Sequence, residues 1–204
     1  GKFTDITASA GIADHDDYYG FQVHFSDYDH DGWPDLFVAN DSTPNLLYHN
    51  QGNGSFREVA LEAGVAYNYE GEGQSGMGAA FGDYDGDGRA DVFLTNYAHE
   101  TNSLYRNRGG GQFEHELWLE HPIIPLGEAG ILSDFNGDGA VDFISTGKED
   151  GLLRLWPGDA NGRFTSRPRV CFDSPYETPH TMTAADIDLD GDLDLFVGQW
   201  KQPY

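Results

Sequence analysis

The sequence predicts an all-β protein built from four-stranded antiparallel units, the blades of a β-propeller, and these residues are expected to be part of a larger propeller. The first observation is an acidic nine-residue loop that recurs four times, starting at residues 27, 83, 134 and 186. The second is that short apolar runs, rich in β-branched and aromatic residues, flank each loop and favour strands over helices. The third is the period: the loops start 56, 51 and 52 residues apart, and four short strands in about fifty residues are typical of a propeller blade.

Each unit has the same order of parts. A first strand is expected before each loop, at 20–25, 76–81, 128–132 and 181–185, and a second after it, at 36–39, 92–95, 143–145 and 195–197. A third strand is expected at 45–50, 102–107 and 152–156. A turn rich in Gly and Asn, suited to positive φ, then leads into a fourth strand that begins near Phe56, Phe113 and Phe164.

The repeats divide the chain into one repeat domain, 1–204, with blades at 13–65, 66–120 and 121–173. Residues 1–12 match residues 54–65, so they are expected to form the final strand of a preceding blade. Residues 174–204 supply only two strands and form half a blade. Closure as a four-bladed ring is the alternative to a longer propeller.

Oxygen ligands at alternating loop positions 1, 3, 5 and 9, with Gly at position 6, predict a Ca²⁺ site in each of the four loops. Closely spaced carboxylates repel one another unless a cation lies among them. The residue at position 7 is expected to add its backbone carbonyl. The predicted ligands are Asp27, Asp29, Asp31, Trp33 and Asp35; Asp83, Asp85, Asp87, Arg89 and Asp91; Asp134, Asn136, Asp138, Ala140 and Asp142; and Asp186, Asp188, Asp190, Asp192 and Asp194.

An EF-hand also begins with D-x-D-x-D-G, but two features argue against it. Position 12 of an EF-hand loop is a bidentate Glu, whereas here it is Val38, Leu94, Ser145 or Val197. The flanking runs are also predicted strands, not helices. Asn136 replaces an Asp, so the third loop is expected to bind Ca²⁺ more weakly. Mg²⁺ fits poorly because it requires a small octahedron and retains its waters.

The formal net charge of −24 argues against nucleic acid and anionic membranes as direct partners. The four loops hold four, four, three and five of the 35 acidic residues, so the remaining surface is also acidic. Cys171 is the single cysteine, which excludes an internal disulfide. Calcium loops without a twelfth ligand suit millimolar Ca²⁺, so a secreted, cell-surface or periplasmic location is expected. The sequence contains no apolar run long enough to insert into a bilayer.

The F-x-D-x-D-x-D-G-x-x-D-L core and the N-x-L-Y-x-N-x-G-x-G-x-F segment after it resemble the FG-GAP/VCBS repeat family. Phe81-Gly82 before Asp83 matches the FG element, whereas Ala184-Ala185 departs from it. The opening T-D-I-T-x-x-A-G-I is similar to proteins that carry an ASPIC/UnbV domain. The resemblance implies an integrin-α-like propeller with calcium in a hairpin loop of each blade. Members serve as adhesion modules, lectins and enzyme appendages, so it predicts fold more specifically than function.

The function favoured by the sequence is a calcium-stabilised extracellular module for binding, adhesion or assembly, with a protein or glycan ligand. An alternative is an enzyme or its accessory domain, but the eight His form no H-E-x-x-H or H-x-H pattern, and no catalytic residue is predicted. His30 is expected to face solvent, and His49 is expected to be a surface residue. Another alternative is lectin-like binding through Trp118, Trp156 and Trp200, although packing between blades is the favoured role of these side chains. Self-association through the end strands is a further possibility.

Overall fold

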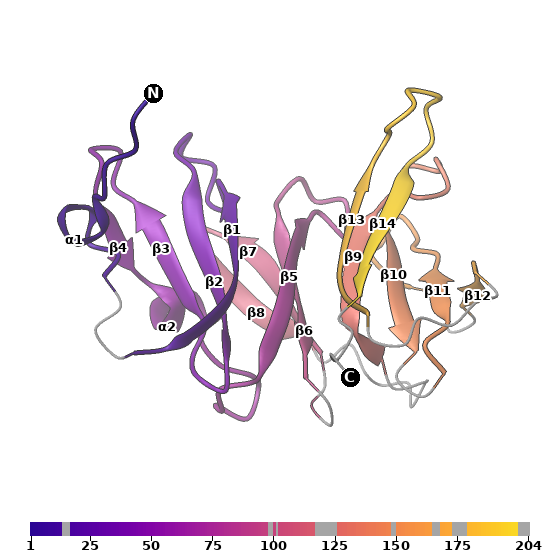
Figure 1. The fold of residues 1–204 in the computed structure, drawn as a ribbon, viewed down its shortest axis with the longest axis horizontal. Coiled ribbons are helices and arrows are strands. Elements are labelled where there is room, and N and C mark those ends of the chain that lie inside the picture. The colour runs from indigo at the N-terminus through magenta and orange to yellow at the C-terminus, as the bar shows by residue number, and fades with distance from the viewer. Residues whose placement is uncertain are drawn as a thin grey trace.

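In a computed structural model, the chain forms three four-stranded antiparallel sheets and a two-stranded hairpin (Figure 1). The structure describes residues 1–13, 17–97, 100, 102–116, 126–147, 150–164, 168–172 and 179–199. Blade 1 contains β1 (Tyr19–Ser26), β2 (Asp35–Asp41), β3 (Leu46–Asn50) and β4 (Phe56–Glu58). Blade 2 contains β5 (Gly76–Gly82), β6 (Asp91–Asn96), β7 (Ser103–Gly109) and β8 (Gln112–Glu116). Blade 3 contains β9 (Leu126–Ser133), β10 (Asp142–Gly147), β11 (Leu153–Trp156) and β12 (Arg169–Val170), and the hairpin contains β13 (Pro179–Ala185) and β14 (Asp194–Gln199).

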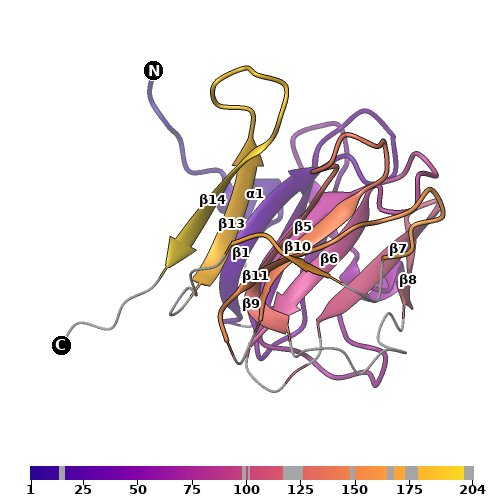
Figure 2. The same ribbon diagram turned by 90° about the vertical axis from the view of Figure 1, so that its right-hand side faces the viewer.

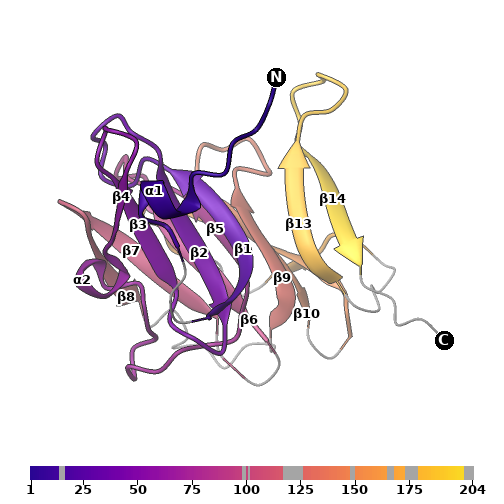
Figure 3. The ribbon, with the colours of Figure 1, turned by 60° about the vertical axis from the view of Figure 1, so that its left-hand side comes forward.

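The strands of each full blade lie in chain order, and the sheets are arranged as an arc. The first strands β1, β5, β9 and β13 contact one another in succession, while the later strands lie farther out (Figure 1). Viewed from the side of blade 3, the sheets lie one behind another (Figure 2). Blade 1 and the hairpin β13–β14 lie toward opposite ends of the arc (Figure 3). The predicted all-β, blade-type fold is confirmed.

The fourth strand of blade 3 begins later than predicted. Phe164 forms only an isolated bridge with Gly158, and the strand itself is β12. Continuing from that bridge, Leu155 would face residue 167, but it pairs with Arg169, two residues farther on. Trp156 and Pro157 lie between the two pairings on the third-strand side, and Pro157 has no N–H to donate to a neighbouring strand. The register between the third and fourth strands therefore shifts by two residues beside this proline.

Residues 1–12 do not form the predicted strand. Residues 1–6 lie outside any helix or strand, and a single helical turn follows, α1 (Thr7–Ala10). The matching segment of blade 1 contains both β4 and a helical turn, α2 (Ala60–Ala63). β4 is a strand because it pairs with β3, whereas no described strand pairs with residues 1–6. The helical turn is kept, since it needs only local hydrogen bonds.

Apolar side chains from both faces of a blade form the core between neighbouring blades. Every residue of β6 is buried. Val92 and Leu94 pack with Phe37 of blade 1. Phe93 points to the other face, where its ring centroid lies 4.5 Å from that of Phe143 in blade 3. Because successive side chains of a strand point to opposite faces, the middle blade contributes to two cores.

One face of β1 is uncovered. It carries Phe21, Val23 and Phe25, which are 56%, 56% and 62% exposed. Phe25 lies two residues before its acidic loop, as do Phe81 in blade 2 and Leu132 in blade 3. Phe81 packs on blade 1 and Leu132 packs on blade 2. The exposed face of β1 therefore corresponds to the surface through which blades 2 and 3 contact the blade before them.

The turn after the third strand of one blade contacts the acidic loop of the blade before it. Gly162, with φ +69°, lies so close to the loop of blade 2 that an added Cβ would be 2.4 Å from Cβ of Asp85. In blade 2, the Asn107 side chain donates to the backbone oxygen of Tyr28 in the loop of blade 1, at 2.7 Å. Adjacent blades are therefore joined at their loops as well as through their cores.

A buried aspartate begins the second strand of each four-stranded blade and joins three segments of that blade. Asp91 is 0% exposed. One carboxylate oxygen accepts the N–H of Tyr84 in the loop (3.1 Å), and the other accepts the N–H of Asn107 in the third strand (2.7 Å). Asp35 and Asp142 make the equivalent pairs of bonds in blades 1 and 3. We call this residue the clamp aspartate.

Replacing the clamp aspartate should destabilise its blade. Asp91→Ala leaves two buried backbone N–H groups without their acceptors, so we expect the free energy of unfolding to fall by about 2–4 kcal/mol. The measurement is urea unfolding in the presence of EDTA, which removes any contribution from bound cations.

Asp194→Ala is the matched control, since Asp194 begins β14, is exposed, and accepts the N–H of Ile187 (3.0 Å). A smaller loss is expected for this variant. Equal losses in the two variants would contradict the role of the clamp.

Candidate metal centres

The four acidic loops have the same backbone hydrogen bonds. The carboxylate at position 1 accepts the N–H groups of positions 5 and 6, and the carboxylate at position 5 accepts the N–H of position 7. From the position-1 carboxylate to these two nitrogens, the distances are 3.1 and 3.0 Å for Asp27, 2.9 and 2.7 Å for Asp83, 3.2 and 2.9 Å for Asp134, and 3.1 and 3.1 Å for Asp186. These bonds curl each loop so that its ligand positions face inward.

The loops require left-handed backbone at two positions. Gly occupies position 6 in every loop, with φ between +87° and +97°. Position 4 is also left-handed: Gly86 and Gly137 have φ +74° and +71°, but His30 and Leu189 have φ +61° and +62°. Such a conformation costs a non-glycine residue about 1–2 kcal/mol. Loops 1 and 4 therefore retain strain that loops 2 and 3 avoid.

The predicted carboxylate ligands converge in loops 1, 2 and 4. Ligand atoms within 4.8 Å of one another come from positions 1, 3 and 5 in loop 1 and from positions 1, 3 and 9 in loops 2 and 4. Two ligands of one Ca²⁺ lie at most about 5 Å apart, because each is about 2.3–2.6 Å from the ion. The carboxylates therefore fit a single calcium ion in each of these loops.

The clamp aspartates have capacity left for a cation. A carboxylate offers about four lone pairs, and the two backbone N–H groups occupy only two of them. Burial raises the pKa of Asp35 to about 6 and that of Asp91 to about 7, and it also raises the pKa of Asp142. By contrast, the N–H of Gly139 holds the pKa of Asp134 below its usual value. The buried charge at position 9 is therefore the one that a cation would stabilise most.

Loop 3 keeps the turn but not the full charge. The Asn136 amide donates to Asp142 at 3.2 Å, and its oxygen accepts the N–H of Asp138 at 2.9 Å. Asn136 thus uses its nitrogen to donate a hydrogen bond to the clamp carboxylate, and it contributes no negative charge of its own. This arrangement agrees in direction with the expectation of weaker Ca²⁺ binding, which remains a prediction.

Position 7 holds Trp33, Arg89, Ala140 and Asp192, and in each loop its N–H donates to position 5 at 2.8–3.0 Å. The use of its carbonyl as a ligand remains a prediction. Arg89 also donates from Nε to the backbone oxygen of Asn107 (2.9 Å) and contacts Asp87 through its guanidinium group. In loop 2, the side chain at this position therefore supplies a positive charge beside the carboxylates.

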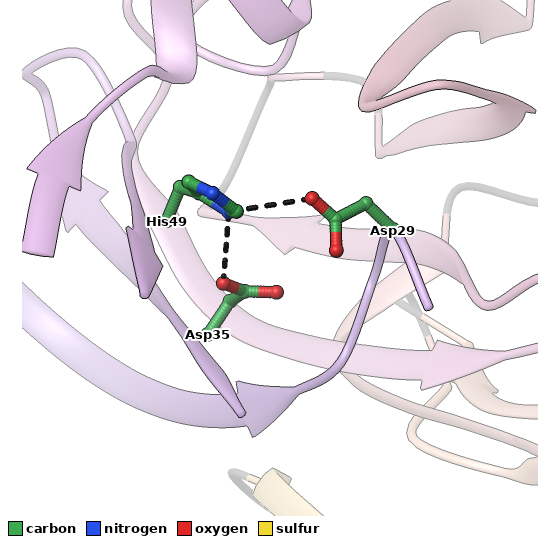
Figure 4. Close-up of side chains that lie close together, drawn as sticks. All are labelled: Asp29, Asp35 and His49. Carbon is green, nitrogen blue, oxygen red and sulfur yellow. Dashed lines mark ion pairs between the residues drawn. The ribbon is translucent and has the colours of Figure 1, made fainter. Parts of the chain in front are cut away.

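The expectation that His49 is a surface residue is wrong. His49 lies on β3, and its Nδ1 atom is 3.3 Å from a carboxylate oxygen of Asp29 and 3.3 Å from one of Asp35 (Figure 4). Arg106 lies at the same position of blade 2 and forms ion pairs with Asp85 and Asp87. The signal in the sequence was that both residues are basic and directly precede an Asn in the Tyr-x-Asn motif. His30 is exposed, as expected.

A groove of about 160 Å³ lies between blades 1 and 2, beside loop 1. Blade 1 contributes Asp29, His49 and Arg57, and blade 2 contributes Gln112 and the adjacent glycines. It also includes Tyr28, whose ring packs in the core. The groove brings together acidic, basic and amide groups from two blades, which is the composition expected of a site for a polar ligand.

Of the tryptophans considered for ligand binding, the structure describes only Trp156. Trp156 lies in the core between blades 2 and 3, 5.4 Å from Phe143 between ring centroids. Trp118 and Trp200 lie outside the described residues. His24 stacks on Phe81, and burial lowers its pKa.

Comparison with known proteins agrees with this geometry. The model of the FG-GAP-like repeat matches residues 27–94, 83–128 and 134–197. Cartilage acidic protein 1 of Homo sapiens is 32% identical over 155 residues, which are 71% of this chain and 22% of that protein. The same protein of Xenopus tropicalis is 29% identical over 157 residues, 71% of this chain and 23% of that protein. The chain thus spans less than a quarter of the length of these relatives.

A solved structure has the same fold. It describes the specific recognition of non-reducing terminal N-acetylglucosamine by an Agrocybe aegerita lectin. The TM-score is 0.58 at 19% identity, over 85% of this chain and 45% of the lectin chain. At this identity the likeness concerns the fold alone. Because the matched repeat segments cover most of residues 27–197 and contain all four acidic loops, the chain belongs to the family of FG-GAP-like repeat proteins.

Proposed function

We propose that this chain is a calcium-stabilised, extracellular β-propeller module that binds a glycan or protein ligand. The observation that carries the proposal is that one loop hydrogen-bonding pattern occurs four times, and that the carboxylates converge in loops 1, 2 and 4. Calcium would be held by the carboxylates at positions 1, 3, 5 and 9, and by the Asn136 oxygen in loop 3. Its role would be to neutralise these charges and hold each hairpin turn.

Two physical arguments support bound calcium over the alternative that water alone hydrates the acidic loops. Three clamp carboxylates are almost completely buried, and a buried charge is costly unless it is paired. In addition, loops without a twelfth glutamate suit the millimolar Ca²⁺ found outside cells. A secreted, cell-surface or periplasmic location follows from this argument. Among the described residues, no helix is long and apolar enough to cross a bilayer.

The groove between blades 1 and 2 is the ligand site that we favour. Its Arg57 and Gln112 side chains offer donors for sugar hydroxyls or for a peptide, and Glu62 offers an acceptor. A lectin of the same fold makes glycans the first class to test. We favour binding over catalysis, and the high negative charge leads us to exclude nucleic acid as a partner. The exposed β1 face is the surface we propose for any self-association.

Calcium should raise the melting temperature of the chain. A Ca²⁺ concentration about 10 to 100 times the dissociation constant stabilises the folded state by about 1.4–2.7 kcal/mol for each occupied loop. The measurement is a thermal melt in EDTA and in 10 mM Ca²⁺. This concentration is about 10 to 100 times the dissociation constant of extracellular calcium sites. Mg²⁺ at the same concentration is the control and should have a smaller effect. An identical melting temperature in EDTA and Ca²⁺ would refute the stabilising role.

The substitution Asn136→Asp should have opposite effects with and without calcium. In EDTA it removes the amide donor to Asp142 and adds a like charge, so a loss of about 1 kcal/mol is expected. With calcium, the added charge should strengthen binding at loop 3 by on the order of tenfold.

Calorimetric Ca²⁺ titration and urea unfolding test both effects. Asp188→Asn makes the reverse change in loop 4 and should weaken binding there. If Asn136→Asp and Asp188→Asn change the Ca²⁺ affinity of their loops in the same direction, the charge of the loop does not determine that affinity.

Ligand binding at the groove should depend on Arg57 and Gln112. A glycan array is read with Ca²⁺ and with EDTA, and glycans ending in N-acetylglucosamine are included. For any glycan retained, Arg57→Ala and Gln112→Ala should each weaken binding about 5- to 50-fold, which corresponds to one or two lost hydrogen bonds. Arg163→Ala, on the exposed turn of blade 3, is the control. Equal binding by all three variants would place the site elsewhere.

A further inference from the structure

The blades differ at one position that faces the acidic loop. This position directly precedes the residue whose N–H binds the clamp aspartate: Asn50, Asn107 or Gly158. It holds a different kind of residue in each blade, namely His49, Arg106 and Pro157. The three loops are therefore similar in backbone but differ in what a neighbouring strand adds to them.

His49 brings a nitrogen ligand to loop 1. Its Nδ1 atom and carboxylate oxygens of Asp29 and Asp35 all lie within 4.8 Å of one another. The imidazole comes from β3, while the two carboxylates come from the loop and from the start of β2, so the three side chains converge from different segments (Figure 4). The Asp35 side chain is only 1% exposed, and those of Asp29 and His49 are 18% and 22% exposed.

The Nδ1 atom of His49 is buried and has no hydrogen bond of acceptable geometry, although it points toward two carboxylates. A buried polar atom that makes no hydrogen bond of acceptable geometry is unusual and calls for an explanation. A metal ion bound between this nitrogen and the two oxygens would supply one. The separations agree: ligands of a tetrahedral ion at about 2.0–2.1 Å lie about 3.3 Å apart, and both measured distances are 3.3 Å.

Blade 2 shows what a different residue does at the same position. Arg106 forms ion pairs with Asp85 and Asp87, so its permanent charge neutralises part of loop 2. A guanidinium has no lone pair to give to a metal. Pro157 of blade 3 offers neither a charge nor a ligand. Among the described third strands, only that of blade 1 offers a nitrogen ligand here.

We propose that loop 1 binds a first-row divalent transition metal ion through Nδ1 of His49 and the carboxylates of Asp29 and Asp35. Imidazole nitrogen favours ions such as Zn²⁺ and Co²⁺, whereas a set of oxygen ligands favours Ca²⁺. The inference rests on the proposed function in that the same loop is a proposed calcium site, and the two ions compete there. The groove of about 160 Å³ reaches both Asp29 and His49, so a metal ion has access to the site from solvent.

Zn²⁺ and Co²⁺ are the probes for this site. Each is titrated calorimetrically into the chain in buffer that already contains saturating Ca²⁺, and Co²⁺ binding is also followed by its visible absorption. We expect one ion for each chain to bind under these conditions. His49→Gln should weaken this binding by at least 10- to 100-fold, because the loss of even an outer-shell partner of a metal ligand costs that much.

Two variants make the test specific. His30→Gln removes the exposed imidazole of the same loop and should leave Zn²⁺ and Co²⁺ binding unchanged. Arg106→His places an imidazole at the equivalent position of blade 2 and should add a second Co²⁺ site. This gain does not depend on whether His49→Gln folds.

The proposal is overturned if His49→Gln and wild type bind Co²⁺ equally, or if wild type binds no transition ion either in saturating Ca²⁺ or without Ca²⁺. In that case His49 acts only as an ion-pair partner of the two aspartates. Ca²⁺-dependent melting of His49→Gln is recorded in parallel. A calcium effect without a Co²⁺ site refutes this inference alone, whereas a Co²⁺ site without any calcium effect refutes only the proposed stabilising role of calcium.

Discussion

The structure of each complete blade depends on a single buried carboxylate. The clamp aspartate begins the second strand, yet its oxygens accept N–H groups from the acidic loop and from the end of the third strand. It therefore joins three segments that the antiparallel ladder alone would leave less firmly connected at this end of the sheet. Burial raises the pKa of Asp35 and Asp91, which means that the charged form is held only because of these donors and of any cation nearby.

A conserved backbone does not make the four loops chemically equal. In loop 3, the neutral Asn136 amide donates a hydrogen bond to the clamp aspartate. In loop 2, Arg106 adds a fixed positive charge. His49 brings loop 1 a nitrogen ligand. In blade 3, Pro157 adds no charge, and the register of the two outer strands shifts by two residues beside it. The repeat thus keeps one turn while it varies how the negative charge is compensated.

The blades also depend on one another. The middle strand β6 contributes to two cores, and the turn at Gly162 approaches the loop of the preceding blade so closely that no side chain fits. Stacked repeats of this kind bury surface that a single unit leaves exposed. This burial is incomplete at both ends of the arc, on the apolar face of β1 and on the hairpin β13–β14, where Phe196 is 64% exposed. The groove beside loop 1 exists only because two blades meet there.

The sequence by itself determined the blade fold, the strand order and the four loops, because the spacing of Asp and Gly within nine residues and the short apolar runs are local signals. It misplaced the fourth strand of blade 3 and assigned a strand to residues 1–12, since pairing depends on a partner strand elsewhere in the chain. Only the tertiary structure decided that His49 and Arg106 reach the acidic loops, because these side chains come from a different strand, which the hairpin folds back over the carboxylates.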